Sequence, residues 1–486
     1  MGKTTVIYKD IAVGAAEAAT VSTSGQTTES APASLVPGVD TGKVVTLEHS
    51  RWALDGSFDV WYENGSYAFW SSALSGADGS FEAPPVITVS FGQQFTSLGV
   101  SLTFDAATGE YCSTVNIRWY QGETLKASQD FAPDNAEYFC EKTVESYDKL
   151  VITLNKTSLP YRRAKLNHIV FGIVRRFGMS ELRSAAVTNE MDESAIELPV
   201  STFNWTLNST SDVEYMFQLK QPVEAWNNDS LLGVYYISGS SRQSANVYDI
   251  ECDDALGVLS ETPFAGGAYL SGVSAKTLLT ALAAPFSVEY ANDVADATLT
   301  GVLLEQTARE AIQQVIFAWG VCLATDGGAV IRVFNRDTEP TVIPQNRTFS
   351  GASVDTDAIV TKVSVTAHTY TAASNGNVKI GGASYNDATT VYTTSNPNVT
   401  ASDRENVKEI TDATLVSTAI GQDVANRVYA YYAKRNTASA RIVYGGERLG
   451  DCISVSTPWG SLTTGNLHKM EIKLSNTVVY AAEVKG

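Results

Sequence analysis

Apolar and polar residues alternate most clearly in the stretch from Ser194 to Leu259. Phe203, Trp205 and Leu207 fall on one face of an extended segment, and the residues between them are polar. A period of two is typical of half-buried strands. Asn-Asn-Asp-Ser and Ser-Gly-Ser-Ser separate the runs, and both are typical turn sequences. The pattern predicts an antiparallel meander that forms a small barrel or a saddle-shaped sheet.

Short apolar runs with turns between them predict a separate β-sandwich upstream of this meander. Its expected strands are residues 44–47, 86–91, 98–104, 115–120, 137–140, 150–154 and 166–171. The segment before it is rich in Ala, Thr, Ser and Gly, and it lacks the apolar surface needed to order by itself. We expect it to be an extended arm that lies across a partner or a neighbouring subunit.

Downstream of the meander the period changes to that of helices. Residues 275–283 form one helix candidate, and Thr307-Ala308-Arg309-Glu310 is a capping box that starts another, ending at Gly320. A hairpin of residues 321–324 and 330–334 follows, which predicts an α+β module. Residues 372–400 are expected to form a surface loop. A long helix over 415–434 then precedes the final strands.

Composition narrows the function classes. The chain has 486 residues and a net charge of −19, which argues against a surface that binds phosphates and is that of an ordinary acidic soluble protein. A basic cluster at Arg162, Arg163, Lys165, Arg175 and Arg176 is expected to meet an acidic neighbour. We expect no signal peptide, no stable membrane insertion and a product made in the cytoplasm.

Chemical motifs do not point to an enzyme. The four histidines are scattered, with no His-Glu-x-x-His pair, no Cys-x-x-Cys and no Gly-x-Ser-x-Gly. We therefore predict no catalytic residue, no metal and no cofactor. The five cysteines are expected to be buried thiols of a reducing compartment, and pairing of Cys112 with Cys140 stays open.

Two motifs carry a resemblance to a known family. They are the strand order around Lys-Gln-Pro-Val-Glu-Ala-Trp and Cys-Asp-Asp-Ala-Leu-Gly-Val-Leu, and the ending Leu-Gly-Asp-x-Ile-x-Val-x-Thr-Pro-Trp-Gly. Both resemble the baseplate hub, or tail-tip, proteins of tailed bacteriophages and phage-like contractile particles. In that family two tube-like domains sit in one chain, so three copies offer six similar sheets to a six-fold tail tube.

A second resemblance concerns the upstream sandwich. Ser-Arg-Trp-Ala-Leu-Asp-Gly-Ser-Phe and Phe-Trp-Ser-Ser-Ala-Leu-Ser look similar to a discoidin-type, galactose-binding-like fold. Trp52, Trp61, Tyr67 and Trp70 are the candidate contacts to a glycan or a partner, because their ring faces could stack on sugar rings. The alternative is that the tryptophans of this region are core plugs of the sandwich.

Together these resemblances imply a mainly β, multidomain fold with α+β elements. The expected divisions are an extended N-terminal arm (1–43), a galactose-binding-like β-sandwich (44–172), a first tube-like domain (173–260), an α+β module (261–344), a β-rich module with a surface loop (345–414), and a helix plus second tube-like domain (415–486).

The implied function is a structural virion component of the tail or baseplate. It would be a homotrimer that caps the tail tube, contacts tube and distal tail proteins, and connects to a spike, a fibre or other baseplate proteins. DNA or an effector would only pass through its channel. One alternative is a carbohydrate-binding adhesin that works through the sandwich. Another is a tail-associated peptidoglycan hydrolase, which would need a catalytic domain after Gly486.

Overall fold

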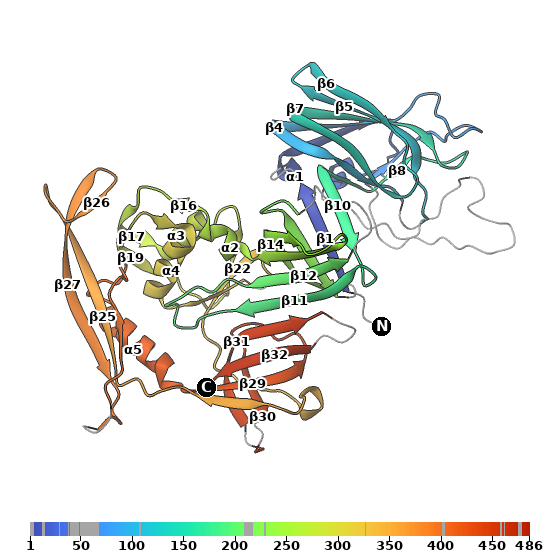
Figure 1. Cartoon of the computed structure of the whole chain (residues 1–486). Coiled ribbons are helices and arrows are strands. Elements are labelled where there is room, and N and C mark those ends of the chain that lie inside the picture. The colour runs from blue at the N-terminus through green and yellow to red at the C-terminus, as the bar shows by residue number, and fades with distance from the viewer. Residues whose placement is uncertain are drawn as a thin grey trace. The chain divides into compact units, whose positions relative to one another are not determined.

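The structure, a computed structural model, describes residues 1–486 except 1–3, 12–14, 29, 37, 39–47, 49–67, 106–107, 209–216, 228–229, 326, 401–403, 457–458, 461 and 475–478. The chain divides into two compact units. The smaller unit is Tyr8–Arg175, and the larger unit combines Met1–Ile7 with Arg176–Gly486. Strands dominate both units, so the predicted mainly β, multidomain fold is confirmed (Figure 1).

The smaller unit is built on one antiparallel sheet in the order β2-β4-β7-β5-β6, with β9 also paired to β4, and β3 pairs with β8 separately. The bounds are α1 (Ala15–Ala18), β2 (Ala19–Ser24), η1 (Pro32–Leu35), β3 (Phe69–Trp70), β4 (Val86–Thr103), β5 (Cys112–Gln121), β6 (Thr124–Phe131), β7 (Glu137–Thr157), β8 (Lys165–Leu166) and β9 (His168–Val170).

Two predicted strand pairs in this unit are each one long strand. Residues 86–91 and 98–103 belong to β4, with residue 104 just beyond its end, and residues 137–140 and 150–154 belong to β7. Their mutual register shifts between Ser90 and Gly99, so the polar Gly-Gln-Gln run is a bulged part of a strand and not a turn. Segment β2, which is too polar to order alone, pairs along β4 of the same chain.

One sheet, most of whose strands belong to the larger unit, has the order β10-β1-β13-β14-β15-β12-β11-β31-β32-β29-β24, with β30 on β31 and β23 on β30. The bounds are β1 (Thr4–Ile11), β10 (Gly172–Phe177), β11 (Leu182–Glu190), β12 (Thr202–Asn208), β13 (Pro222–Asn227), β14 (Ser230–Arg242), β15 (Val247–Asp253), β23 (Thr341–Val342), β24 (Ser353–Thr356), β29 (Asn436–Val443), β30 (Cys452–Ser456), β31 (Leu462–Lys473) and β32 (Val479–Lys485).

The predicted meander is present, with one correction. Asn227 at the end of β13 pairs with Ser230 at the start of β14, and the predicted turn residues between them, 228–229, lie outside the described residues. The Ser-Gly-Ser-Ser run, Ser238 to Ser241, is not a turn, because β14 continues through it to Arg242. A bulge between Ile237 and Gly239 accommodates the small residues within the strand.

An α+β module packs beside this sheet (Figure 1). Its elements are α2 (Ala255–Ser260), β16 (Pro263–Phe264), β17 (Ala268–Ser274), α3 (Ala275–Leu282), β18 (Ser287–Tyr290), β19 (Thr298–Leu303), β20 (Gln306–Thr307), α4 (Ala308–Trp319), β21 (Cys322–Ala324) and β22 (Val330–Phe334). The predicted capping box of Thr307 and Glu310 is confirmed, and Gly320 ends α4 at a φ of 86°.

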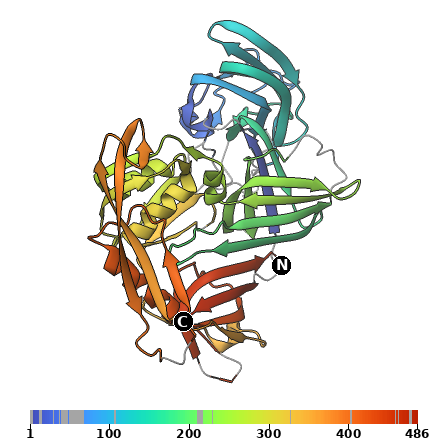
Figure 2. The same ribbon diagram turned by 60° about the vertical axis from the view of Figure 1, so that its left-hand side comes forward.

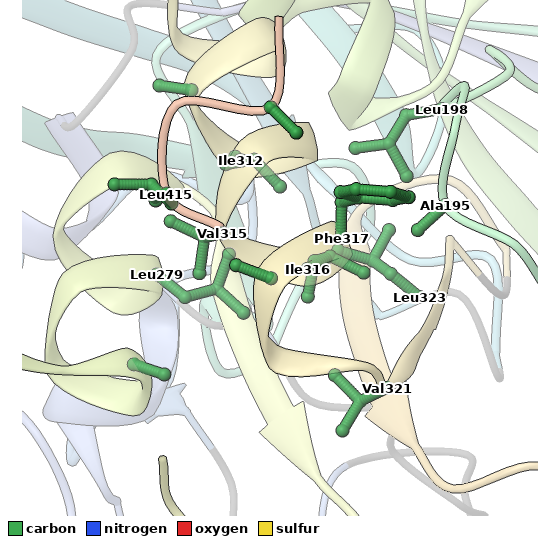
Figure 3. Close-up of a cluster of buried hydrophobic side chains, with 14 of the residues drawn as sticks. Ala195, Leu198, Leu279, Ile312, Val315, Ile316, Phe317, Val321, Leu323 and Leu415 are labelled. Carbon is green, nitrogen blue, oxygen red and sulfur yellow. The ribbon is translucent and has the colours of Figure 1, made fainter. Parts of the chain in front are cut away.

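Helix α4 is the centre of this module's core. Its buried face, with Ile312, Val315 and Ile316, meets Leu279 of α3 and Leu415 from a distant part of the chain (Figure 3). Residues 3 or 4 apart lie on one face of a helix, which is why this spacing buries a continuous stripe. The core therefore ties the α+β module to the segment that leads into α5.

A further module is inserted between β24 and β29 (Figure 2). It holds β25 (Lys362–Ala372), β26 (Val378–Ile380), β27 (Ala383–Ser395), β28 (Val407–Ile410) and α5 (Gly421–Ala433), and a short η2 (Gln345–Arg347) precedes β24. The predicted surface loop over 372–400 is wrong for most of its length, because β27 pairs along β25 despite its small polar residues. The predicted helix over 415–434 begins later than expected, because Leu415 and Val416 are buried in the module core before the helix starts. Among the described residues, no helix combines the length and apolarity that crossing a membrane requires.

Candidate assembly surface

The sheet of the larger unit contains the same five-stranded arrangement twice. The first repeat consists of β11 to β15, and the second repeat consists of β24 and β29 to β32. Taken along the chain as strands a to e, each repeat has the spatial order c-d-e-b-a, and every pair is antiparallel. The notion of two similar β units far apart in the chain is therefore supported by shared topology.

The two repeats also share their register. In the first repeat, β14 has a bulge after Ile237, which faces Cys252 of β15. In the second, β31 has a bulge after Leu467, which faces Val484 of β32. All four of these residues are buried. An equivalent bulge is a specific feature, because it fixes which residues of a strand face the core.

Backbone hydrogen bonds beside the bulge repeat as well. Lys220 N donates to Ile237 O at 2.7 Å, and Ile237 N donates to Gln221 O at 3.0 Å. At the equivalent place, Gly450 N donates to Leu467 O at 2.8 Å, and Leu467 N donates to Asp451 O at 3.0 Å. The strand that follows, β13 or β30, then continues along the same edge in the same register.

The core residues of the second strand occupy equivalent positions but differ in size. Phe203, Trp205 and Leu207 point into the first repeat. Their register equivalents in β29 are Ala438, Ala440 and Ile442, which are also buried. The geometry is thus repeated without repetition of the sequence, and the first repeat carries the larger aromatic core.

The repeats join edge to edge where β11 pairs with β31. The pairs run from Ala186 opposite Lys473 to Glu190 opposite Lys469. Two backbone bonds frame this junction: Met191 N donates to His468 O, and Leu474 N donates to Ala185 O, both at 2.9 Å. One edge of β31 therefore carries β30 along its first half and β11 along its second half.

A buried polar network lies close in sequence to the paired strands, at Glu193 after β11 and Asn466 of β31. Glu193 accepts from Lys434 Nζ at 2.8 Å, and only 5% of the Glu193 side chain is exposed. Asn466 of β31, itself 1% exposed, accepts from Arg336 Nε at 3.0 Å. Burial lowers the pKa of Lys434, although the contact with Glu193 opposes this shift. The network connects β31 with the ends of α5 and β22.

A second buried carboxylate lies at the start of α2. Asp254 caps this helix by accepting from Gly257 N at 3.1 Å, and it also accepts from Ser201 N at 2.9 Å and from the Thr325 hydroxyl. Complete burial raises the pKa of Asp254 to about 6, although these hydrogen bonds act in the opposite direction. The carboxylate ties β12, α2 and β21 together, which explains its position in structural terms.

The four aromatic candidates for ligand contact are not brought together on a described surface. Trp52, Trp61 and Tyr67 lie outside the described residues. Trp70 is 9% exposed and lies in β3, where Lys165 Nζ is 5.1 Å from its ring centroid. The expectation of a glycan or partner contact at these residues stays a prediction.

Part of the predicted basic cluster finds acidic partners within its own unit. Arg162 Nε lies 2.5 Å from Glu110 Oε1, and Lys165 Nζ lies 2.8 Å from Glu48 Oε2. Lys165 also lies within 4 Å of Asp105 and Glu110. These side chains are almost completely buried, so they form an internal charge network of the smaller unit.

The five cysteines are buried and free, and burial alone raises the pKa of Cys112 to about 12. The part of the chain that the structure describes contains no group of three or more residues suited to hold a metal ion. The repeated sheet and its edges are the feature on which the functional proposal below rests. Sequence patterns did not indicate β24, one of those edges, because only one of its four residues is apolar.

A scan against protein-family models finds no match, and a search of curated proteins finds none either. Among solved structures, the chain is similar to a tail protein from Neisseria meningitidis MC58, with 11% identity, a TM-score of 0.49, and coverage of 64% of this chain and 94% of that one. It is also similar to a 43 kDa tail protein of prophage MuSo2 from Shewanella oneidensis, with 10% identity, a TM-score of 0.45, and coverage of 64% of this chain and 95% of that one. A chain of a native gene transfer agent virion is similar with 13% identity, a TM-score of 0.31, and coverage of 92% of this chain and 89% of that one. These are tail and virion proteins, so the predicted resemblance to that class is confirmed, and the discoidin-type resemblance stays a prediction.

Proposed function

We propose that this chain is a structural protein of a virion tail or baseplate, whose five-stranded repeats form a ring that caps the tail tube. The observation that carries the proposal is the duplication itself. Two sheets with one topology and one register are joined edge to edge through β11 and β31.

A junction between unlike edges of equivalent units is heterologous. Such a contact, repeated, builds either a closed ring or an open helix. A chain that holds two repeats closes a ring of six with three copies. Three copies therefore suit a six-fold tube, as the resemblance to hub proteins implies. The proposed partners are tube and distal tail proteins on one side, and a spike, a fibre or other baseplate proteins on the other.

The acidic composition is compatible with a channel for DNA or an effector. A net charge of −19 on each chain repels nucleic acid, so a passing strand is not held. In this proposal the chain does no chemistry on what passes through it.

The mass of the purified chain tests the proposal. We expect a trimer in multi-angle light scattering, either alone or once purified tube protein is added, and ring-shaped particles with six similar lobes in electron micrographs. A chain that stays single with and without tube protein at micromolar concentrations would refute the ring.

A further inference from the structure

We infer that the outer edge of β24 pairs with the second half of β14 of another copy of this chain, in an antiparallel register that places Asp355 opposite Ser241. The inference rests on the ring proposed above and names the strands that close it. It follows from carrying the β11–β31 junction over to the equivalent strands of the two repeats.

Strand β24 presents an open edge with defined backbone groups. It is the last strand in the order of its sheet, and it pairs only with β29 among the described residues. Asp357 N donates to Arg435 O at 2.8 Å, so Asp355 and Ser353, at alternate positions, also turn toward β29. The N–H and C=O groups of Val354 and Thr356 therefore point away from the sheet, toward solvent.

Strand β14 presents a complementary open edge. Its first half carries β13, and Ile237 bonds to Gln221, but no described strand pairs with this edge from Ser238 to Arg242. Gln243 N donates to Val247 O at 2.8 Å on the other edge, so Ser241 turns toward β15. The backbone groups of Ser240 and Arg242 point outward.

The junction within the chain supplies the register. Thr188 of β11 faces Glu471 of β31 there. Shared pairing within the repeats makes Thr188 equivalent to Asp355, and Glu471 equivalent to Ser241. Asp355 therefore faces Ser241. The outward backbone groups then match, because Val354 meets Arg242 and Thr356 meets Ser240.

Side-chain exposure also distinguishes the two open edges from the paired edge of β31. Met470 and Ile472 of β31, which lie in the existing junction, are buried. Their equivalents in β14, Ser240 and Arg242, are exposed, and so are Ser353, Asp355 and Thr356 of β24. Unpaired strand edges are templates for another chain. The polar side chains on both edges suit strands that are soluble before they pair.

Cysteine pairs test the register. Neighbouring residues across an antiparallel pair have Cβ atoms about 4.5–5.5 Å apart, close enough for a disulfide. We expect Asp355→Cys with Ser241→Cys to give chains cross-linked up to a trimer on a non-reducing gel. Asp355→Cys with Arg242→Cys, shifted by one residue to the opposite face, is the matched control and should cross-link poorly. Thr188→Cys with Glu471→Cys is the positive control, because it should close a disulfide within one chain.

A proline variant tests the backbone bonds. Val354→Pro removes an N–H that points away from β29, so the variant should keep the parent's circular dichroism spectrum and lose the ring in light scattering. Its melting temperature should also lose the dependence on protein concentration that assembly gives the parent. Rings that survive Val354→Pro, or equal cross-linking at Ser241 and Arg242, would overturn the pairing while leaving the proposed ring intact. A parent chain that never assembles would overturn both.

Discussion

Lys469 contacts Glu190 across 2.5 Å, and the two residues face each other at the end of the β11–β31 pair. The contact with Glu190 raises the pKa of Lys469. Its position means that the two repeats are connected by side chains as well as by the backbone ladder.

A double-mutant cycle measures this contact. About a third of each side chain is exposed, and pairs of this kind contribute about 0.5 kcal/mol. We expect Glu190→Gln, Lys469→Met and the double variant to give a coupling energy of that size in urea unfolding. The coupling should shrink in 1 M salt, because exposed charges are screened. A coupling that is independent of salt would contradict an ionic contact.

The buried carboxyl group of Asp254 should make the free energy of unfolding depend on pH. Its carboxyl titrates near 3.8 when unfolded and at about 6 when folded, so the folded chain holds the proton more tightly. The resulting stabilisation is complete below pH 3.8 and is lost as pH rises through about 6, an effect of about 3 kcal/mol. Urea unfolding of the parent and of Asp254→Asn from pH 4.5 to 7.5 should differ in slope by this contribution.

Thr325→Val provides the accompanying control, since it removes a donor that favours the charged carboxylate. The pKa of Asp254 should rise further in this variant, and the window of pH dependence should move upward with it. An identical slope in the parent and in both variants would refute the role of Asp254.

Replacing the buried carboxylate of Glu193 by an apolar side chain should lower the free energy of unfolding substantially. Glu193→Leu leaves the buried ammonium of Lys434 without its carboxylate, and unpaired buried charges cost about 3–5 kcal/mol. The double variant Glu193→Leu with Lys434→Met should recover much of this loss, because it removes both charges from the interior. Equilibrium unfolding of the three variants decides the matter, and equal losses in the single and double variants would count against it.

Lys165 allows a matched comparison in the smaller unit. Lys165→Met leaves Glu48, Asp105 and Glu110 buried without that cation, so we expect a loss of about 3 kcal/mol or more. Lys149→Met breaks the pair with Glu123, whose side chain is 96% exposed, and a contact with the Tyr120 ring, and should cost about 1 kcal/mol or less. Thermal unfolding distinguishes them, and similar costs for both would show that the buried network contributes little.

Local patterns in the sequence predicted the elements that depend on local chemistry. The Thr307–Glu310 capping box and Gly320 set the bounds of α4, and alternation at Phe203 and Trp205 identified β12. These signals are readable because the residues that create them lie within a few positions of one another.

The two edges for which we propose pairing between copies could not be predicted in the same way. Strand β24 has the sequence Ser-Val-Asp-Thr and is a strand only because β29, far along the chain, pairs with it. The Ser-Gly-Ser-Ser run of β14 indicated a turn, since small polar residues favour turns, and the pairing with β15 overrides that preference. Both edges are products of long-range pairing.

The module inserted between β24 and β29 has a consequence for the order of folding. Strand β24 must close a loop of about eighty residues to reach β29, and such closure carries a higher entropic cost than a hairpin. Ribosomes also make β29 and β32 after β24, so this strand waits in the nascent polypeptide for its template. The outer edge of β24, for which we propose pairing with another copy, therefore forms late, which keeps unfinished chains from pairing prematurely.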